Sequence, residues 1–241
     1  MKEAFGTLYG IGVGPGDPDL ITVKAMQVLK KVDVIYTASS SKNQHSLAVQ
    51  IAMPHIPENT AVERLAFPMS RDRETLEAAW QENAQTVVSQ LAKGRDVAFL
   101  TLGDCLTYST YGYLARHVEQ IAPAAQMVAV PGITSYQAAA ARLNRPLVEG
   151  EESLLVMSGV RGGGKFRKLA KDLESVVFLK AYKNITDIAD ALSENGWKNG
   201  SVGLLSCGLP KERIVSDISE FKTARPDYWT LILAKQGKGY E

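Results

Sequence analysis

The sequence predicts an α/β protein of two lobes. The first lobe is expected to hold a mostly parallel sheet with helices on both faces, and the second a mixed sheet. Short apolar strands alternate with helical segments through the first half of the chain, which is typical of a parallel sheet. The 241 residues suffice for two lobes that each bury a core. We place the lobes at residues 1–121 and 122–241, because Pro123 interrupts the pattern there.

In the first half, apolar residues at helical spacing alternate with short apolar runs. The run from Leu20 to Val32 is typical of an amphipathic helix. Pro54 ends a second expected helix, Ser46–Met53. Gly94 follows the longest helical segment, where a left-handed C-cap belongs. The expected strands are Thr7–Val13, Val34–Tyr36, Val97–Leu102 and Met127–Val130, and the expected helices are Leu20–Val32, Ser46–Met53, Arg73–Lys93 and Tyr111–Ile121.

The second half again mixes short apolar runs with helical segments. A helix rich in small residues is expected at Ser135–Leu143, and a second helix at Thr186–Asn195 is closed by Gly196. The expected strands are Ser153–Met157, Val176–Leu179, Gly203–Ser206 and Trp229–Ala234.

The composition is that of an ordinary soluble globular protein. A formal net charge of +1 gives no electrostatic reason to expect nucleic acid or an acidic membrane as partner. Cys105 and Cys207 are the two cysteines and form no CxxC motif, so neither a disulfide framework nor a structural zinc site is expected. No apolar run has the length of a membrane span, and the first residues lack the apolar core of a signal peptide. We therefore expect a soluble, cytoplasmic protein.

The first glycine-rich loop follows the first strand and reads GIGVGPG from Gly10. It does not fit the dinucleotide-binding pattern GxGxxG, because Pro15 or Asp17 stands where the third glycine is needed. Proline also removes a backbone N–H that a pyrophosphate would use. Two alternatives remain: a tight turn from strand to helix, and a loop for a different ligand.

The second glycine-rich loop runs from Gly159 to Lys165 and matches GxxxxGK. Phe166 stands where a P-loop carries the Ser or Thr that binds Mg²⁺. We interpret this segment as a mobile surface loop. A nucleotide hydrolase stays open as an alternative from a different class of function.

The third loop, LGDCLTYST from Leu102, mixes glycine, one carboxylate, hydroxyls and tyrosine at the end of a predicted parallel strand. Ligands of open α/β sheets bind at this edge. Gly103 permits close approach of the backbone, and Asp104 supplies a carboxylate. Asp104 could instead, or in addition, cap the helix that follows.

Three segments together resemble the tetrapyrrole methylases, a class of methyltransferases that use S-adenosylmethionine: VGPGDPDLITVKA, LGDCLTYST and VPGITSYQAAAARL. Their order and separation match, and the resemblance covers essentially the whole chain. FPMS at Phe67–Ser70 and GLPKERI from Gly208 are most similar to the branch that methylates C20 of a corrin precursor in cobalamin synthesis, in its anaerobic, cobalt-dependent form. One departure is Cys105, which stands where the family's GDP motif has proline.

The resemblance implies two α/β lobes with S-adenosylmethionine, the source of S-adenosylhomocysteine, folded between them, and a homodimer. Pro15 would border the donor site. The methionine end of the donor would lie against residues of the third loop and the PGITS turn: Leu102, Gly103, Asp104, Thr107, Thr134 and Ser135. The adenosine would contact residues of the second lobe: Ala181, Tyr182, Cys207 and Thr230.

Such a donor pocket needs charge complements but no metal, and His45, His55 and His117 stand singly. An electron-rich tetrapyrrole carbon loses a proton after attack and requires no strong base beforehand, so the motifs identify no catalytic residue. Basic residues could bind the acceptor's carboxylates: Lys42, Arg71, Arg73, Arg161 and Lys165, the last two giving the second glycine loop a lid role. Precorrin-2 without cobalt is the alternative acceptor, and a tetrapyrrole-binding module without catalysis is a further alternative.

Overall fold

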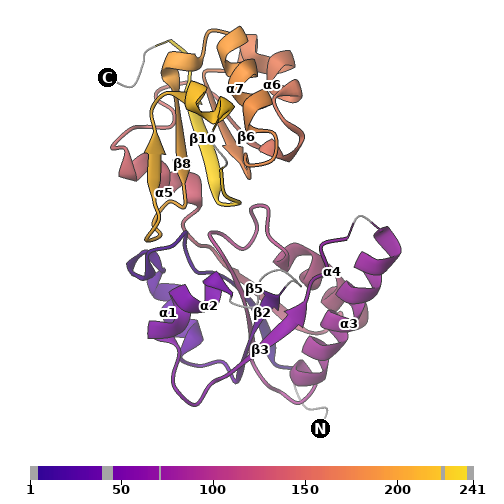
Figure 1. Cartoon of the computed structure of the whole chain (residues 1–241). Helices are drawn as coiled ribbons and strands as arrows, with labels where there is room; N and C mark the ends of the chain where they lie inside the picture. Colours follow the sequence, from indigo (N-terminus) through magenta and orange to yellow (C-terminus); the bar gives the residue numbers. More distant parts are fainter. Residues whose placement is uncertain (1–4, 40–45, 71, 224–225, 238–241) are drawn as a thin grey trace. The chain divides into compact units, whose positions relative to one another are not determined.

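The computed structural model describes residues 5–39, 46–70, 72–223 and 226–237. The chain divides into two compact units, Met1–Thr134 and Ser135–Glu241 (Figure 1). The lobe boundary predicted after residue 121 falls inside the first unit. The reason is that β5 (Gln126–Val130) pairs with β1 (Thr7–Gly12) in the first sheet.

The first unit contains a five-stranded sheet in the order β3-β2-β4-β1-β5. Every neighbouring pair in it is parallel, which confirms the predicted sheet. Residue Gly12 is level with Thr101, and Ile11 with Val130, so these strands end at one edge. The remaining strands are β2 (Val34–Ser39), β3 (Ala61–Ala66) and β4 (Val97–Thr101).

Helices cover both faces of this sheet, as predicted. Alternating side chains of a strand point to opposite faces. Phe99 therefore joins a core with α3 (Arg73–Leu91) and α4 (Tyr111–Ile121). Its neighbour Leu100 joins a core on the opposite face, with α1 (Val23–Leu29) and α2 (Leu47–Ala52). Between the first strand and α1 lies a short 3-10 helix, η1 (Pro18–Leu20), and η2 (Met53–His55) follows α2.

The second unit contains a five-stranded sheet in the order β6-β7-β10-β8-β9. The β6–β7 pair is parallel, whereas the three other pairs are antiparallel, so the sheet is mixed as expected. Its strands are β6 (Leu154–Ser158), β7 (Ser175–Leu179), β8 (Ser201–Leu205), β9 (Arg213–Val215) and β10 (Thr230–Lys235).

Helices also cover both faces of the mixed sheet. On one face, Phe178 packs with Phe166 and Trp197 in a core that includes α6 (Gly164–Leu169), α7 (Ile185–Glu194) and η6 (Ile218–Lys222). On the other face, Val177 and Leu231 pack against α5 (Ser135–Arg142). Three more 3-10 segments connect these elements: η3 (Gly159–Arg161), η4 (Ala170–Asp172) and η5 (Lys198–Gly200).

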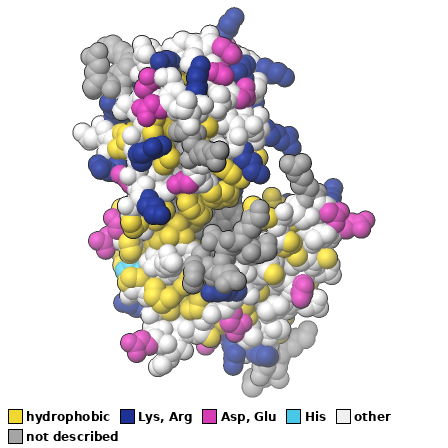
Figure 2. Space-filling view, viewed as in Figure 1, with side chains coloured by type: hydrophobic (Ala, Val, Ile, Leu, Met, Phe, Trp, Pro, Cys, Tyr) yellow, Lys and Arg dark blue, Asp and Glu magenta, His cyan; other side chains and the backbone are white. Residues whose placement is uncertain are grey.

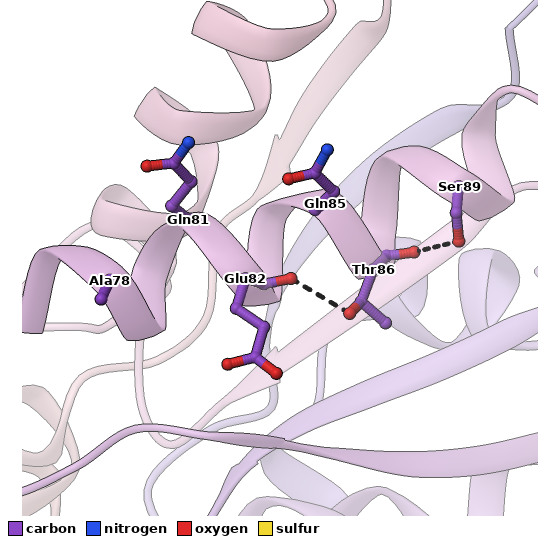
Figure 3. A pocket seen from close by; sticks show the side chains of 6 residues that line it. All are labelled: Ala78, Gln81, Glu82, Gln85, Thr86 and Ser89. Carbon is purple, nitrogen blue, oxygen red and sulfur yellow. Dashed lines mark hydrogen bonds between the residues drawn. The ribbon is translucent and has the colours of Figure 1, made fainter.

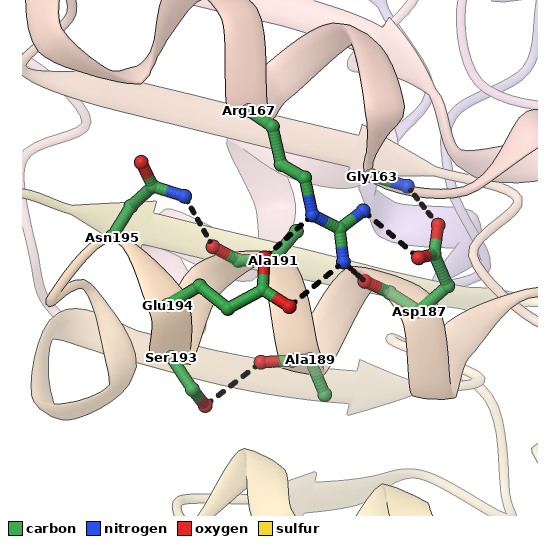
Figure 4. A network of polar contacts seen from close by, with 8 residues as sticks. All are labelled: Gly163, Arg167, Asp187, Ala189, Ala191, Ser193, Glu194 and Asn195. Atoms are coloured by element: carbon green, nitrogen blue, oxygen red, sulfur yellow. Dashed lines mark hydrogen bonds and ion pairs between the residues drawn. The ribbon is translucent and has the colours of Figure 1, made fainter.

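The prediction of a mobile loop from Gly159 to Lys165 is wrong. This segment forms η3 and the start of α6, and the backbone N–H of Gly163 donates to Asp187 at 2.7 Å. Arg167 reaches the other carboxylate oxygen of Asp187 at 2.8 Å and also Glu194 at 2.6 Å (Figure 4). The carboxylate of Asp187 therefore fastens the segment to α7, an arrangement unlike that of a lid.

Candidate functional site

The carboxyl edge of the first sheet carries three turns, which follow β1, β4 and β5. Beyond the strands, Val13 N–H donates to the carbonyl of Thr101 at 3.0 Å. Gly14 N–H donates to the carbonyl of Gly103 at 3.1 Å, and Gly103 N–H donates back to Gly14 at 2.7 Å. The first and third glycine loops of the sequence are thus joined backbone to backbone.

Glycine is required where the turns meet. A β-carbon on Gly132 would lie 2.2 Å from the carbonyl oxygen of Gly103, and one on Gly12 would lie 2.6 Å from the same atom. Gly103 itself has a φ of 71°, in the left-handed region that favours glycine. The three turns therefore approach one another with backbone alone, at a distance that only glycine permits.

Asp104 ties the turns together. Its Oδ1 accepts hydrogen bonds from the Leu106 N–H at 2.9 Å and the Thr107 hydroxyl at 3.1 Å, while Oδ2 accepts from the Gly132 N–H at 3.1 Å. The capping role considered for Asp104 is wrong, since Thr110 occupies the N-cap of α4. A carboxylate has about four lone-pair sites, and these three bonds use both sites of Oδ1 and one site of Oδ2. In the structure Asp104 therefore links the third glycine loop to the turn that follows β5. Its pairing with a cationic part of a ligand stays a prediction.

Cys105, the departure from the family motif, points into the core. Its side chain is fully buried, and its thiol donates to the carbonyl of Val130 at 3.4 Å. Burial, followed by the charge of Asp104, raises the pKa of the Cys105 thiol to about 11. The thiol is therefore neutral and inert at physiological pH, as expected for a packing residue.

The other predicted residues of the first unit lie around the same turns. Pro15 is buried and directly follows Gly14, whereas Leu102 and Thr107 are half-buried. Thr134 is buried, with its Cα 3.9 Å from where a Gly103 β-carbon would stand. Ser135 is the first residue of α5, where the second unit begins.

One edge of the second sheet brings together the predicted second-lobe residues. Ala181 follows β7 and donates its N–H to the carbonyl of Thr230, the first residue of β10, at 2.9 Å. Thr230 is level with Leu205, the last residue of β8, and Cys207 lies two residues further along. Ala181, Cys207 and Thr230 are buried.

Asp227 organises this edge and was not among the residues predicted for the site. Its carboxylate accepts from the Ser206 hydroxyl at 2.7 Å and from the Trp229 N–H at 3.0 Å. Its carbonyl accepts from the Thr230 hydroxyl at 2.8 Å. Tyr228, also missed, has its ring 5.2 Å from that of Tyr182, and burial raises its pKa, as does the neighbouring Tyr182. The sequence signal that could have identified both residues is an acidic residue, Asp227, immediately before an aromatic pair and a strand.

Strained backbone also marks the strand ends. Tyr108, Lys180 and Ser206 have φ values of 51°, 56° and 51°, although none of them is glycine. Each lies beyond the carboxyl end of a strand, β4, β7 or β8 respectively. Such conformations concentrate at functional sites, where the surrounding structure holds them. Burial lowers the pKa of the Lys180 amine.

The remaining candidate features are ordinary surface structure. A hollow along α3 is lined by side chains of that helix alone, among them Gln81, Glu82 and Gln85 (Figure 3), so no groups from other elements converge on it. His117 contacts Glu77 at 3.1 Å, and His55 contacts the carbonyl of Pro18 at 3.3 Å. His45 lies outside the described residues. Within the described ranges no three His, Cys, Asp or Glu side chains gather as metal ligands would.

The GxxxxGK segment does not have the features of a P-loop. The N–H of Gly163 is already donated to Asp187, and Phe166, at the position of the Mg²⁺-binding hydroxyl, is fully buried in the core. Lys165 is exposed. Nothing in this geometry supports the nucleotide hydrolase alternative.

The distribution of charged side chains and the hydropathy of the helices match what the composition led us to expect. On the face drawn in Figure 2, basic and acidic side chains are interspersed. In the described part of the chain, no helix is both long and apolar enough to cross a membrane.

Several relatives align with most of this chain. The cobalt-precorrin-2 C(20)-methyltransferase of Salmonella typhimurium (strain LT2) is 33% identical, covering 96% of this chain and 97% of the relative. The probable cobalt-precorrin-2 C(20)-methyltransferase of Methanocaldococcus jannaschii is 35% identical over 78% and 77% of the two chains. The precorrin-2 C(20)-methyltransferase of a Sinorhizobium species is 30% identical over 95% and 94%.

Solved structures have the same fold. A cobalt precorrin-4 methyltransferase superposes with a TM-score of 0.73 at 24% identity, covering 95% of this chain and 94% of the other. A uroporphyrin-III C-methyltransferase from Thermus thermophilus, in complex with S-adenosylhomocysteine, gives 0.67 at 22% identity, covering 95% and 97%. Residues 7–221 match the family described as tetrapyrrole (corrin/porphyrin) methylases. With this match over most of its length and relatives of such identity, the chain belongs to the tetrapyrrole methylase family.

Proposed function

We propose that this protein is an S-adenosylmethionine-dependent methyltransferase that methylates C20 of cobalt-factor II (cobalt-precorrin-2) in cobalamin biosynthesis. The observation that carries the proposal is the 33% identity to a protein of that name over nearly the whole of both chains. The Sinorhizobium relative, named for precorrin-2, favours the metal-free acceptor as the second candidate.

The turns of the first unit suit the methionine end of the donor. Close-packed glycines bring the backbones of the three turns together, and Asp104 offers a carboxylate beside them. In the proposal Asp104 attracts a cationic part of the donor, while Pro15, Leu102, Gly103, Thr107, Thr134 and Ser135 line its surroundings. When bound, S-adenosylmethionine supplies a methyl group on a sulfonium, which leaves by displacement at carbon.

The sheet edge of the second unit suits an adenosine. Ala181 and Cys207 offer small buried side chains, Tyr182 offers an aromatic ring, and Thr230 is fixed by Asp227. We propose these four residues as the adenosine contacts. Their role is to fix the donor's orientation, a contribution that can supply ~7 kcal/mol or more to catalysis of a displacement reaction.

The acceptor is rich in carboxylates and needs cations nearby. Arg73, Arg161 and Lys165 are exposed and remain proposed contacts, whereas Lys42 and Arg71 lie outside the described residues. Arg73 lies 3.8 Å from Glu77, which offsets part of its charge. The acceptor carbon is an electron-rich enamine, so the proposal assigns no general base. A homodimer and a cytoplasmic location complete the proposal.

The test is incubation of the protein with S-adenosylmethionine and cobalt-factor II, or with precorrin-2, followed by mass spectrometry. The proposal expects one added methyl group, and S-adenosylhomocysteine as the second product. The relative rates on the two acceptors distinguish the two candidates. Failure to methylate either acceptor, by protein that is folded, would overturn the proposal.

A further inference from the structure

The segment GLPKERI, from Gly208 to Ile214, holds a half-buried carboxylate, that of Glu212, at the same sheet edge. The Glu212 side chain is 18% exposed, and its Oε1 accepts from the Arg142 Nε at 2.7 Å. Its Oε2 accepts from the backbone N–H of Gly208 at 2.8 Å. Both oxygens of Glu212 are therefore used to fasten other parts of the second unit.

The contacts of Glu212 join two segments that carry proposed donor contacts. Arg142 is the last residue of α5, whose first residue is Ser135. Gly208 directly follows Cys207. The ion pair thus fixes the far end of the helix that begins with Ser135 to the loop that carries Cys207. Asp227 accepts a hydrogen bond from the hydroxyl of the preceding residue, Ser206, at 2.7 Å.

The charge of Glu212 also adds to the effect of burial on the pKa of Cys207. Burial, followed by the charge of Glu212, raises the pKa of the Cys207 thiol to about 11. Burial alone would raise the pKa of Glu212, but hydrogen bonds from Gly208 and Arg142 hold it below its usual range. At neutral pH a charged Glu212 therefore stands beside a neutral thiol. A neutral thiol is a small polarisable surface suited to packing against an aromatic ring.

An ordinary surface ion pair would contribute little, because two exposed charges are well solvated. The Lys222–Asp190 pair is of that kind, at 3.2 Å with side chains 56% and 41% exposed. The Arg142–Glu212 pair differs in that one partner is largely buried and also satisfies a backbone donor. Losing such an acceptor leaves that donor without a partner.

We propose that Glu212 and Arg142 are positioning residues for the methyl donor, which hold the Cys207 loop and α5 in the arrangement that binds it. The inference rests on the proposed function, since it takes Cys207 and Ser135 as donor contacts. It gives the GLPKERI segment, which contains none of the proposed donor contacts, a role in donor binding.

The test compares S-adenosylhomocysteine affinity, by calorimetry, in Glu212→Gln, Arg142→Gln, the double variant and the control Lys222→Gln. For Glu212→Gln we expect affinity to fall about tenfold, since a charged hydrogen bond is lost. For Arg142→Gln, whose side chain is 60% exposed, a loss of about threefold is expected. The double variant should lose little more than Glu212→Gln, because the two residues act as a unit. Lys222→Gln should bind like the wild type.

A second measurement separates positioning from general stability. The rate at which iodoacetamide labels Cys207, followed by peptide mass spectrometry against pH, reports the thiol and its loop. In Glu212→Gln the pKa of Cys207 should fall and labelling at a given pH should be several-fold faster. Lys222→Gln should leave the pH profile of Cys207 labelling unchanged. A loss of stability that does not involve this loop should leave that profile unchanged as well.

The outcomes distinguish the two levels of the proposal. If the wild type does not bind S-adenosylhomocysteine, the proposed function fails and this inference fails with it. If the wild type binds and methylates, but both Glu212→Gln and Arg142→Gln bind within twofold of it, the inference alone is overturned. Arg142→Gln keeps the test decisive if Glu212→Gln does not fold, because Arg142 is the exposed partner.

Discussion

Replacing Asp104 with alanine is the perturbation that the site geometry describes most fully. The change removes the acceptor of three hydrogen bonds: from the Leu106 N–H at 2.9 Å, the Thr107 hydroxyl at 3.1 Å and the Gly132 N–H at 3.1 Å. Two of the donors are backbone groups in different turns. The substitution therefore removes the hydrogen bond that ties the third glycine loop to Gly132, in the turn that follows β5.

The expected loss of stability follows from these contacts. Hydrogen bonds to a charged group contribute ~1.5–3 kcal/mol each when they are buried. Asp104 is half-buried, and water can replace its bonds to Leu106 and Thr107, so the bond to Gly132 dominates. We expect a fall of about 2 kcal/mol in the free energy of unfolding. Donor affinity should fall at least tenfold, or ~1.4 kcal/mol, since the turns that hold the methionine end separate.

The assay is urea unfolding for stability and calorimetry with S-adenosylhomocysteine for affinity. The matched control is Asp72→Ala, which removes the N-cap of α3, where Asp72 accepts from the Thr75 N–H at 2.9 Å. Loss of that cap should cost ~1 kcal/mol of stability and leave donor affinity unchanged. The reasoning is refuted if Asp104→Ala keeps wild-type affinity, or if Asp72→Ala weakens the donor equally.

Three further changes test other parts of the structure. Gly132→Ala should destabilise the protein and abolish donor binding, because its β-carbon would lie 2.2 Å from the carbonyl oxygen of Gly103. The control is Gly112→Ala in α4, whose β-carbon would meet nothing within 4 Å and which should raise the melting temperature. Thermal melts with and without S-adenosylhomocysteine check both. Burial raises the pKa of the two thiols to about 11, above ~8.5 for an unfolded chain. Their contribution to stability is therefore complete below pH 8.5 and lost as the pH rises toward 11, so Cys207→Ala should flatten the fall in urea-unfolding free energy over that interval. Arg167→Gln should speed amide hydrogen exchange at Gly163 without changing it in the first unit, since Arg167 fixes the carboxylate that holds that N–H.

Most of the fold could be predicted because its strands are apolar and its helices amphipathic. The helix Tyr111–Ile121 begins and ends as predicted, and β4 needed only its four buried apolar residues to be recognised. Strand β3 was missed because it lies at the sheet edge, with Leu65 as its one buried residue, so no hydrophobic pattern marks it. Strand β9 has three residues, of which only Val215 is buried.

The glycine loop after β6 was misread for a different reason. Its glycines favour mobility when read locally, but Asp187 and Arg167 supply long-range contacts that no local pattern contains. The same limit explains the link formed by Asp104. A carboxylate at a strand end is visible in the sequence, whereas its bond to Gly132, 28 residues away, depends on the order of strands in the sheet.

We propose that the turns at the carboxyl ends of β1, β4 and β5 hold the methyl donor. Hydrogen exchange with and without S-adenosylhomocysteine measures this directly, peptide by peptide. With S-adenosylhomocysteine bound, we expect slower exchange at residues 102–107 and 131–135, and in the segments that carry Ala181 and Cys207. Protection confined to other parts of the chain, with residues 102–107 exchanging as in the free protein, would contradict it.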